Sequence, residues 1–135
     1  MNRKAALALI LISASVMTIL AQKRPYDVVM KEVNTTFGNL RKNLDSSAMP
    51  SAIDDAAKLQ SLFKETEDFW AQFKTKDALD AAKGAQDAAA AIAAAAKANN
   101  IQKAQASYNA VGKSCNGCHA SHREQMPDKS FKIKP

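Results

Sequence analysis

The feature that most limits how this chain can fold is the alanine-rich run at residues 87–100, which reads DAAAAIAAAAKANN. Alanine has the highest helix propensity of all residues and is depleted in strands, so the run predicts a long helix. The chain has 135 residues, which suits one domain, and contains only four glycines and four prolines. These properties favour a single all-α domain over a β-sandwich, a dinucleotide-binding α/β fold or a multi-domain chain.

The first 21 residues have the layout of a secretory signal peptide. Arg3 and Lys4 precede an uncharged stretch that ends at Ala21, and a polar run follows. We expect cleavage after Ala21, export to the periplasm and a mature domain of residues 22–135. The alternative is an uncleaved membrane anchor, because the seventeen uncharged residues are near the lower limit for spanning a bilayer.

The net charge of +6 becomes smaller when the signal peptide is removed. Loss of Arg3 and Lys4 leaves 17 basic against 13 acidic residues, and these are interspersed along the chain. No stripe of Lys and Arg with interleaved aromatic residues is present in the sequence, so we do not expect the protein to bind nucleic acid.

Four segments carry apolar residues at alternating three- and four-residue spacing, which is the period of an amphipathic helix. They span residues 26–44, 50–73, 76–99 and about 101–122. In the second segment, Ser51 and Asp54 have the spacing of a capping box. Because the connections are short, we expect an antiparallel up-down-up-down four-helix bundle.

The alanine-rich face of the third segment, which includes Leu79 and Ile92, indicates a modest core. Helices lined by alanine bury little apolar area, so the larger Phe37, Phe63, Trp70 and Phe73 must fill space elsewhere. At this chain length, the composition predicts that a bulky prosthetic group completes the interior.

Residues 115–119, Cys-Asn-Gly-Cys-His, form the C-x-x-C-H motif that attaches c-type haem. Two thiols three positions apart lie on one side of a helix and can both add to the vinyl groups of a single haem. We therefore expect one haem c, attached through Cys115 and Cys118, with His119 as the proximal iron ligand. Covalent attachment follows translocation, so the motif and the export signal support each other.

Two other interpretations of the cysteines have weaker support. A thioredoxin-like redox pair would stand near a βαβ pattern, which the sequence lacks. A zinc site made of Cys115, Cys118, His119 and His122 would crowd four ligands into eight residues, whereas structural zinc sites usually separate their ligand pairs.

A haem motif on the last of four helical segments resembles the arrangement in class II cytochromes c, the cytochrome c prime family. The stretch CNGCHASHR is similar to the family pattern C-x-x-C-H-x-x-Tyr/Phe-Arg, with His122 where an aromatic residue is usual. The resemblance covers roughly residues 25–125. It implies the haem-binding four-helix fold and a place for Arg123 near a haem propionate. For His122 we expect packing or a propionate contact.

The resemblance also implies that Met30 faces the distal side of the haem. The stretch YDVVMKEVNTTFGNLRKNL is similar to the family's first helix, which supplies a methionine as sixth iron ligand in the low-spin branch. Relatives with Leu, Phe or Tyr there bind NO or CO, and many carry an arginine where this chain has Tyr26. Met30 is therefore the expected distal ligand, with an ordinary core methionine as the alternative. Met49 and Met126 are weaker candidates.

These expectations describe a periplasmic one-electron carrier rather than an enzyme, since nothing else in the sequence points to catalysis. The alternatives are a five-coordinate protein that binds NO or CO and a haem subunit of a larger membrane complex. We expect redox proteins as partners, and members of the family often form homodimers through their first two helices. Acidic partners would suit the basic residues around the haem motif, which are Lys113, Arg123, Lys129, Lys132 and Lys134.

Overall fold

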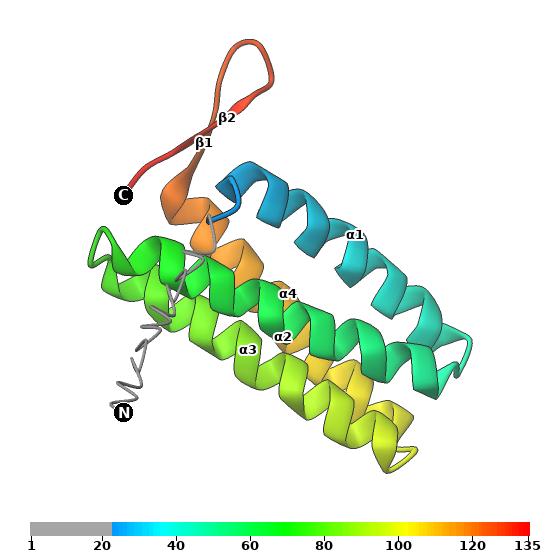
Figure 1. The fold of residues 1–135 in the computed structure, drawn as a ribbon. Helices are drawn as coiled ribbons and strands as arrows, with labels where there is room; N and C mark the ends of the chain where they lie inside the picture. Colours follow the sequence, from blue (N-terminus) through cyan, green and yellow to red (C-terminus); the bar gives the residue numbers. More distant parts are fainter. Residues whose placement is uncertain (1–22) are drawn as a thin grey trace, which may run out of the picture.

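The computed structural model describes residues 23–135, and the expected signal peptide with its cleavage site after Ala21 lies outside this range. The described chain contains four helices (Figure 1): α1 Tyr26–Asp45, α2 Met49–Ala71, α3 Lys76–Lys97 and α4 Ile101–His122. The prediction of an all-helical domain with four helices is confirmed. A small antiparallel hairpin, which the sequence did not predict, follows α4 and consists of β1 Arg123–Gln125 and β2 Phe131–Ile133.

The helices begin close to the predicted positions, but the predicted N-terminal cap of α2 was wrong. The side chain of Asn100 caps α4 by accepting a hydrogen bond of 3.0 Å from the backbone N–H of Lys103. The capping box predicted from Ser51 and Asp54 is not formed. Instead α2 begins at Met49 with a proline in its first turn, and no side chain caps this helix. Proline has the φ angle of a first helical turn, so the helix starts before the serine.

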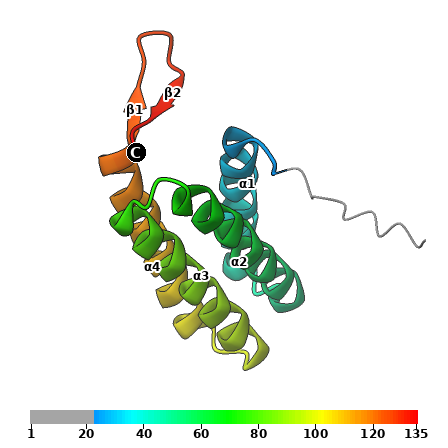
Figure 2. The ribbon, with the colours of Figure 1, turned by 60° about the vertical axis from the view of Figure 1, so that its left-hand side comes forward.

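Helices that follow one another in the chain pack against one another. In both views α2 lies between α1 and α3, and α3 packs against α4, whereas α1 makes few contacts with α4 (Figure 1 and Figure 2). This arrangement is compatible with a four-helix bundle. Among residues 23–135, no helix combines the length and the apolar character needed to cross a membrane.

The alanine-rich face of α3 is buried, as predicted. Its buried residues are Ala78, Ala82, Ala85, Ala89, Ile92, Ala95 and Ala96. Leu79 is only half-buried. The larger buried side chains come mainly from the other helices and include Leu40, Leu44, Leu59, Phe63 and Trp70. The expectation that Phe73 fills space in the interior was wrong, because this residue follows the end of α2 and is 45% exposed.

Core packing predicts a large loss of stability in Leu59→Ala. The side chain of Leu59 is fully buried in α2, so its truncation leaves a cavity and lowers the free energy of unfolding by about 2–5 kcal/mol. The matched control, Val28→Ala, alters a side chain that is 42% exposed on α1 and should change this value by about 0.5 kcal/mol or less. Urea unfolding followed by circular dichroism measures both. Equal effects of the two substitutions would contradict the assignment of the core.

Candidate functional site

A cavity of about 740 Å³ lies among the four helices and the hairpin. Its size is within the range of about 300–1,000 Å³ that is usual for ligand and cofactor pockets. The first half of α1 and of α3 and the second half of α2 and of α4 line it, together with residues of the hairpin. We call it the central cavity.

All five residues predicted to bind the haem line the central cavity. Cys115, Cys118 and His119 come from the last two turns of α4, and Arg123 follows directly at the start of β1. Met30 comes from α1 and is half-buried. The fold thus brings to one cavity a methionine and a haem motif that are separated by more than 80 residues in the sequence.

The wall that α3 contributes is built from residues with little side-chain volume. Ala78, Ala81, Ala82 and Ala85 line the cavity from α3, and Gly112 lines it from α4. The methyl group of alanine covers the helix backbone at these positions but does not extend into the cavity. Further along α3, alanines at the same spacing pack against the other helices. At the beginning of α3 they leave room for the central cavity.

An aromatic pair that the sequence did not single out connects α1 to α4 beside the cavity. The rings of Phe37 and Tyr108 stack with their centroids 4.1 Å apart and their planes 3° from parallel. The Tyr108 hydroxyl also donates a hydrogen bond of 3.3 Å to the backbone carbonyl of Phe37. Since α1 and α4 make few other contacts, this pair sets how far apart the two helices stand.

A second aromatic group consists of Tyr26, Phe69 and Trp70, of which Tyr26 and Trp70 line the central cavity. Trp70 Nε1 donates a hydrogen bond of 3.0 Å to the hydroxyl of Tyr26, whose ring stacks on Phe69 with 4.0 Å between centroids. Burial raises the pKa of Tyr26 to about 12, although the hydrogen bond from Trp70 opposes this shift. The phenol is therefore neutral at physiological pH.

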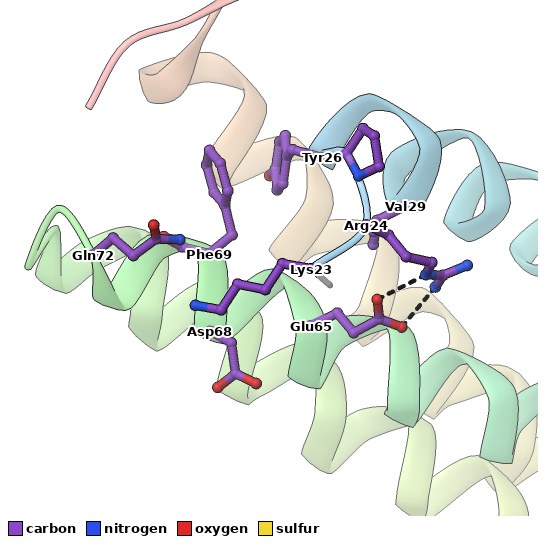
Figure 3. A pocket seen from close by; sticks show the side chains of 9 residues that line it. Lys23, Arg24, Tyr26, Val29, Glu65, Asp68, Phe69 and Gln72 are labelled. Carbon is purple, nitrogen blue, oxygen red and sulfur yellow. Dashed lines mark hydrogen bonds and ion pairs between the residues drawn. The ribbon is translucent and has the colours of Figure 1, made fainter. Parts of the chain in front are cut away.

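Tyr26 also lines a second, smaller cavity of about 300 Å³ between α2 and the residues before α1 (Figure 3). An ion pair closes one side of it, with Arg24 Nη2 at 2.6 Å and Arg24 Nε at 2.9 Å from the two carboxylate oxygens of Glu65 (Figure 3). None of the residues predicted to bind haem lines this cavity.

The surroundings of the two cysteines disfavour their thiolate forms. Burial raises the pKa of Cys115 and of Cys118, and the negative charge of Asp77 adds to the shift at Cys118. Both residues lie in the last two turns of α4, where the helix dipole also opposes a negative charge. Redox-active C-x-x-C thiols instead have lowered pKa values, so a thioredoxin-like role is not favoured.

The environment of His119 favours a neutral ring. Burial lowers the pKa of His119, and the positive charge of Arg123 lowers it further. The neutral imidazole is the form in which histidine binds metals. Within residues 23–135, no three His, Cys, Asp or Glu side chains are arranged so that they could hold a metal ion.

His122 is bonded through both ring nitrogens and packs near Trp70, with 4.9 Å between ring centroids. Its Nε2 lies 2.8 Å from Asp77 Oδ2, and its Nδ1 lies 2.8 Å from the carbonyl oxygen of Lys134. Because both partners are acceptors, only the doubly protonated ring satisfies both bonds. Burial lowers the pKa of His122, but these bonds and the charge of Asp77 outweigh it and raise the pKa overall.

No protein-family model matches this chain, and neither a curated protein nor a solved structure matches it. The functional interpretation therefore depends on the residues that line the central cavity.

The His122–Asp77 pair predicts a stability difference between the unaltered protein and Asp77→Asn that depends on pH. The raised pKa of His122 means that its contribution is present below its ordinary value of 6.5 and is lost as the pH rises through the folded-state pKa. The lowered pKa of Asp77 means that its contribution is present above 3.8 and is lost as the pH falls through the folded-state pKa. The difference in free energy of unfolding should therefore be largest between pH 3.8 and 6.5.

Urea unfolding at a series of pH values measures this difference. Asp80→Asn is the matched control, since Asp80 is an exposed carboxylate on the same helix that pairs with Lys76 rather than with a histidine. Its effect should not change between pH 6 and 8. An equally flat profile for Asp77→Asn would contradict the prediction.

Proposed function

We propose that this protein is a periplasmic electron carrier that holds one haem c among its helices, like the low-spin class II cytochromes c that it resembles. One observation carries the proposal: a single cavity of about 740 Å³ is lined by Cys115, Cys118 and His119 of the C-x-x-C-H motif and by Met30 of a different helix. The alanine wall of this cavity explains why so much volume is left among the helices.

The side chains present fit the group. The two cysteine sulfurs would hold the haem covalently, and the imidazole of His119 and the thioether of Met30 would be the iron ligands that the chain supplies. When bound, the haem supplies one-electron Fe(III)/Fe(II) chemistry, and a His/Met ligand pair raises its potential relative to weaker ligands. A methionine bound to the iron would also block the binding of NO and CO. Phe63 and Trp70 would exclude water from the apolar side of the cavity.

We further propose that the four helices form an antiparallel up-down-up-down bundle. The connections are short, at residues 46–48, 72–75 and 98–100. The cavity is lined by the beginnings of α1 and α3 and by the ends of α2 and α4, as an arrangement with alternating directions requires.

An acidic redox protein is the partner that suits this site best. Basic residues lie on both sides of the haem motif in the sequence. Among the described residues, Lys113, Arg123, Lys129, Lys132 and Lys134 take part in no ion pair. Unpaired charges on this surface would accelerate the association with a negatively charged protein, and salt would weaken this effect.

Covalent haem attachment predicts the behaviour of the cysteine variants. Protein produced in cells with a c-type haem maturation pathway should carry one haem that resists acid–acetone extraction. Because each thiol forms one bond, Cys115→Ser and Cys118→Ser should each lose part of the attachment, and the double variant all of it. Mass spectrometry and the pyridine haemochrome spectrum measure this. Absence of attached haem from the unaltered protein would overturn the proposed function.

Ligation by Met30 predicts a low-spin ferric spectrum with a far-red sulfur–iron band that is absent from Met30→Leu. The midpoint potential of the variant should fall by on the order of 0.1 V, a fraction of the range over which axial ligands tune haem. Two matched controls, Met49→Leu and Met126→Leu, alter methionines that do not line the central cavity and should leave both properties unchanged. A high-spin ferric spectrum in the unaltered protein at neutral pH would contradict ligation and support the NO- or CO-binding alternative.

A further inference from the structure

The C-terminal hairpin needs an anchor to hold a fixed position. Its turn is closed by its own bonds: the Met126 N–H donates to the Ser130 carbonyl at 2.8 Å, and the Asp128 carboxylate accepts from the Ser130 N–H and hydroxyl at 2.9 and 2.6 Å. The strands have three residues each, and the hairpin extends beyond the helices in both views (Figure 1 and Figure 2). Two such strands are marginally stable on their own.

His122 provides this anchor. The backbone carbonyl of His122 accepts a hydrogen bond of 2.9 Å from the Lys134 N–H, and its ring Nδ1 bonds the Lys134 carbonyl oxygen at 2.8 Å. The other ring nitrogen bonds Asp77, in the first turn of α3, at 2.8 Å. One residue therefore connects the beginning of α3, the end of α4 and the chain after β2.

The hairpin so anchored forms one wall of the central cavity. Arg123 of β1 and Phe131 and Ile133 of β2 line the cavity together with Cys118 and His119. Arg123 and Ile133 pair across the two strands, and the Arg123 guanidinium lies 4.2 Å from the centroid of the Phe131 ring. Displacement of the hairpin would remove all three side chains from the cavity at once.

We propose that His122 is a positioning residue that holds the C-terminal hairpin as a wall of the haem cavity and so limits the access of water to the haem. This inference rests on the proposed function. Water stabilises the more highly charged ferric state, and solvent exposure is one of the main determinants of haem potential. A protein whose hairpin has been released should therefore have a lower midpoint potential.

The test uses the haem-loaded full-length protein and His122→Phe, which keeps an aromatic ring beside Trp70 but removes both ring hydrogen bonds. Trypsin should cleave this variant after Lys129 or Lys132 at least roughly tenfold faster than the unaltered protein, since cleavage follows the population of the released hairpin. The midpoint potential should fall towards that of a chain ending at Gln125, which lacks β2 and with it the Phe131 and Ile133 part of the wall. Asp77→Ala, which removes only one bond, should fall between these limits.

The matched control is Asp80→Ala, which alters a neighbouring carboxylate on α3 that His122 does not contact. It should leave both the cleavage rate and the potential unchanged. Attached haem with an unchanged potential in His122→Phe and in the truncated chain would overturn the inference and leave the proposed function intact. Faster cleavage without a change in potential would also overturn it, because the hairpin would then be anchored but would not protect the haem. If His122→Phe does not fold, Asp77→Ala and the truncated chain decide between these results.

Discussion

The small side chains on the buried face of α3 are the constraint on which the rest of the structure depends. Ala89, Ala95 and Ala96 allow α3 to pack closely with its neighbours in the core. Ala78, Ala82 and Ala85 continue the same face, but there they border the central cavity. The same alanine face therefore packs closely in one part of α3 and borders a cavity in another part. The difference depends on which side chains the other helices place opposite it. Beside Leu40, Leu44 and Leu59 of α1 and α2, the helices enclose a solid core. The hollow part is the central cavity.

The hollow part keeps its shape because aromatic residues hold its border. The Phe37–Tyr108 stack joins α1 to α4, and the group of Tyr26, Phe69 and Trp70 joins α1 to α2. Each group combines ring contact with a hydrogen bond from a hydroxyl or an indole N–H, which makes it directional as well as apolar. The central cavity is thus bordered by side chains that fix the distance between helices.

The sequence contains the local part of this structure and little of the non-local part. Helix period and alanine content are properties of neighbouring residues, so four helices could be predicted from them. The spacing of Cys115, Cys118 and His119 is equally local, and the haem site expected from it stays a prediction. The bond between Asp77 and His122 joins residues 45 positions apart, and no local pattern indicates it. The sequence does not predict the hairpin for a different reason. Its strands are too short for a clear alternation, although the Pro-Asp-Lys-Ser stretch after Met126 is a turn signal that could have been read.

The position of Arg123 shows how local and non-local constraints combine at the site. The resemblance to class II cytochromes c implies a contact between this arginine and a haem propionate, and the residue follows the last helix directly. Its guanidinium is held by the Phe131 ring, which belongs to the other strand of the hairpin. Stacking on a ring leaves the N–H donors in the guanidinium plane available, so an arginine held in this way can still bind a carboxylate through two bonds. The propionate contact would then depend on the hairpin and, through it, on His122 and Asp77.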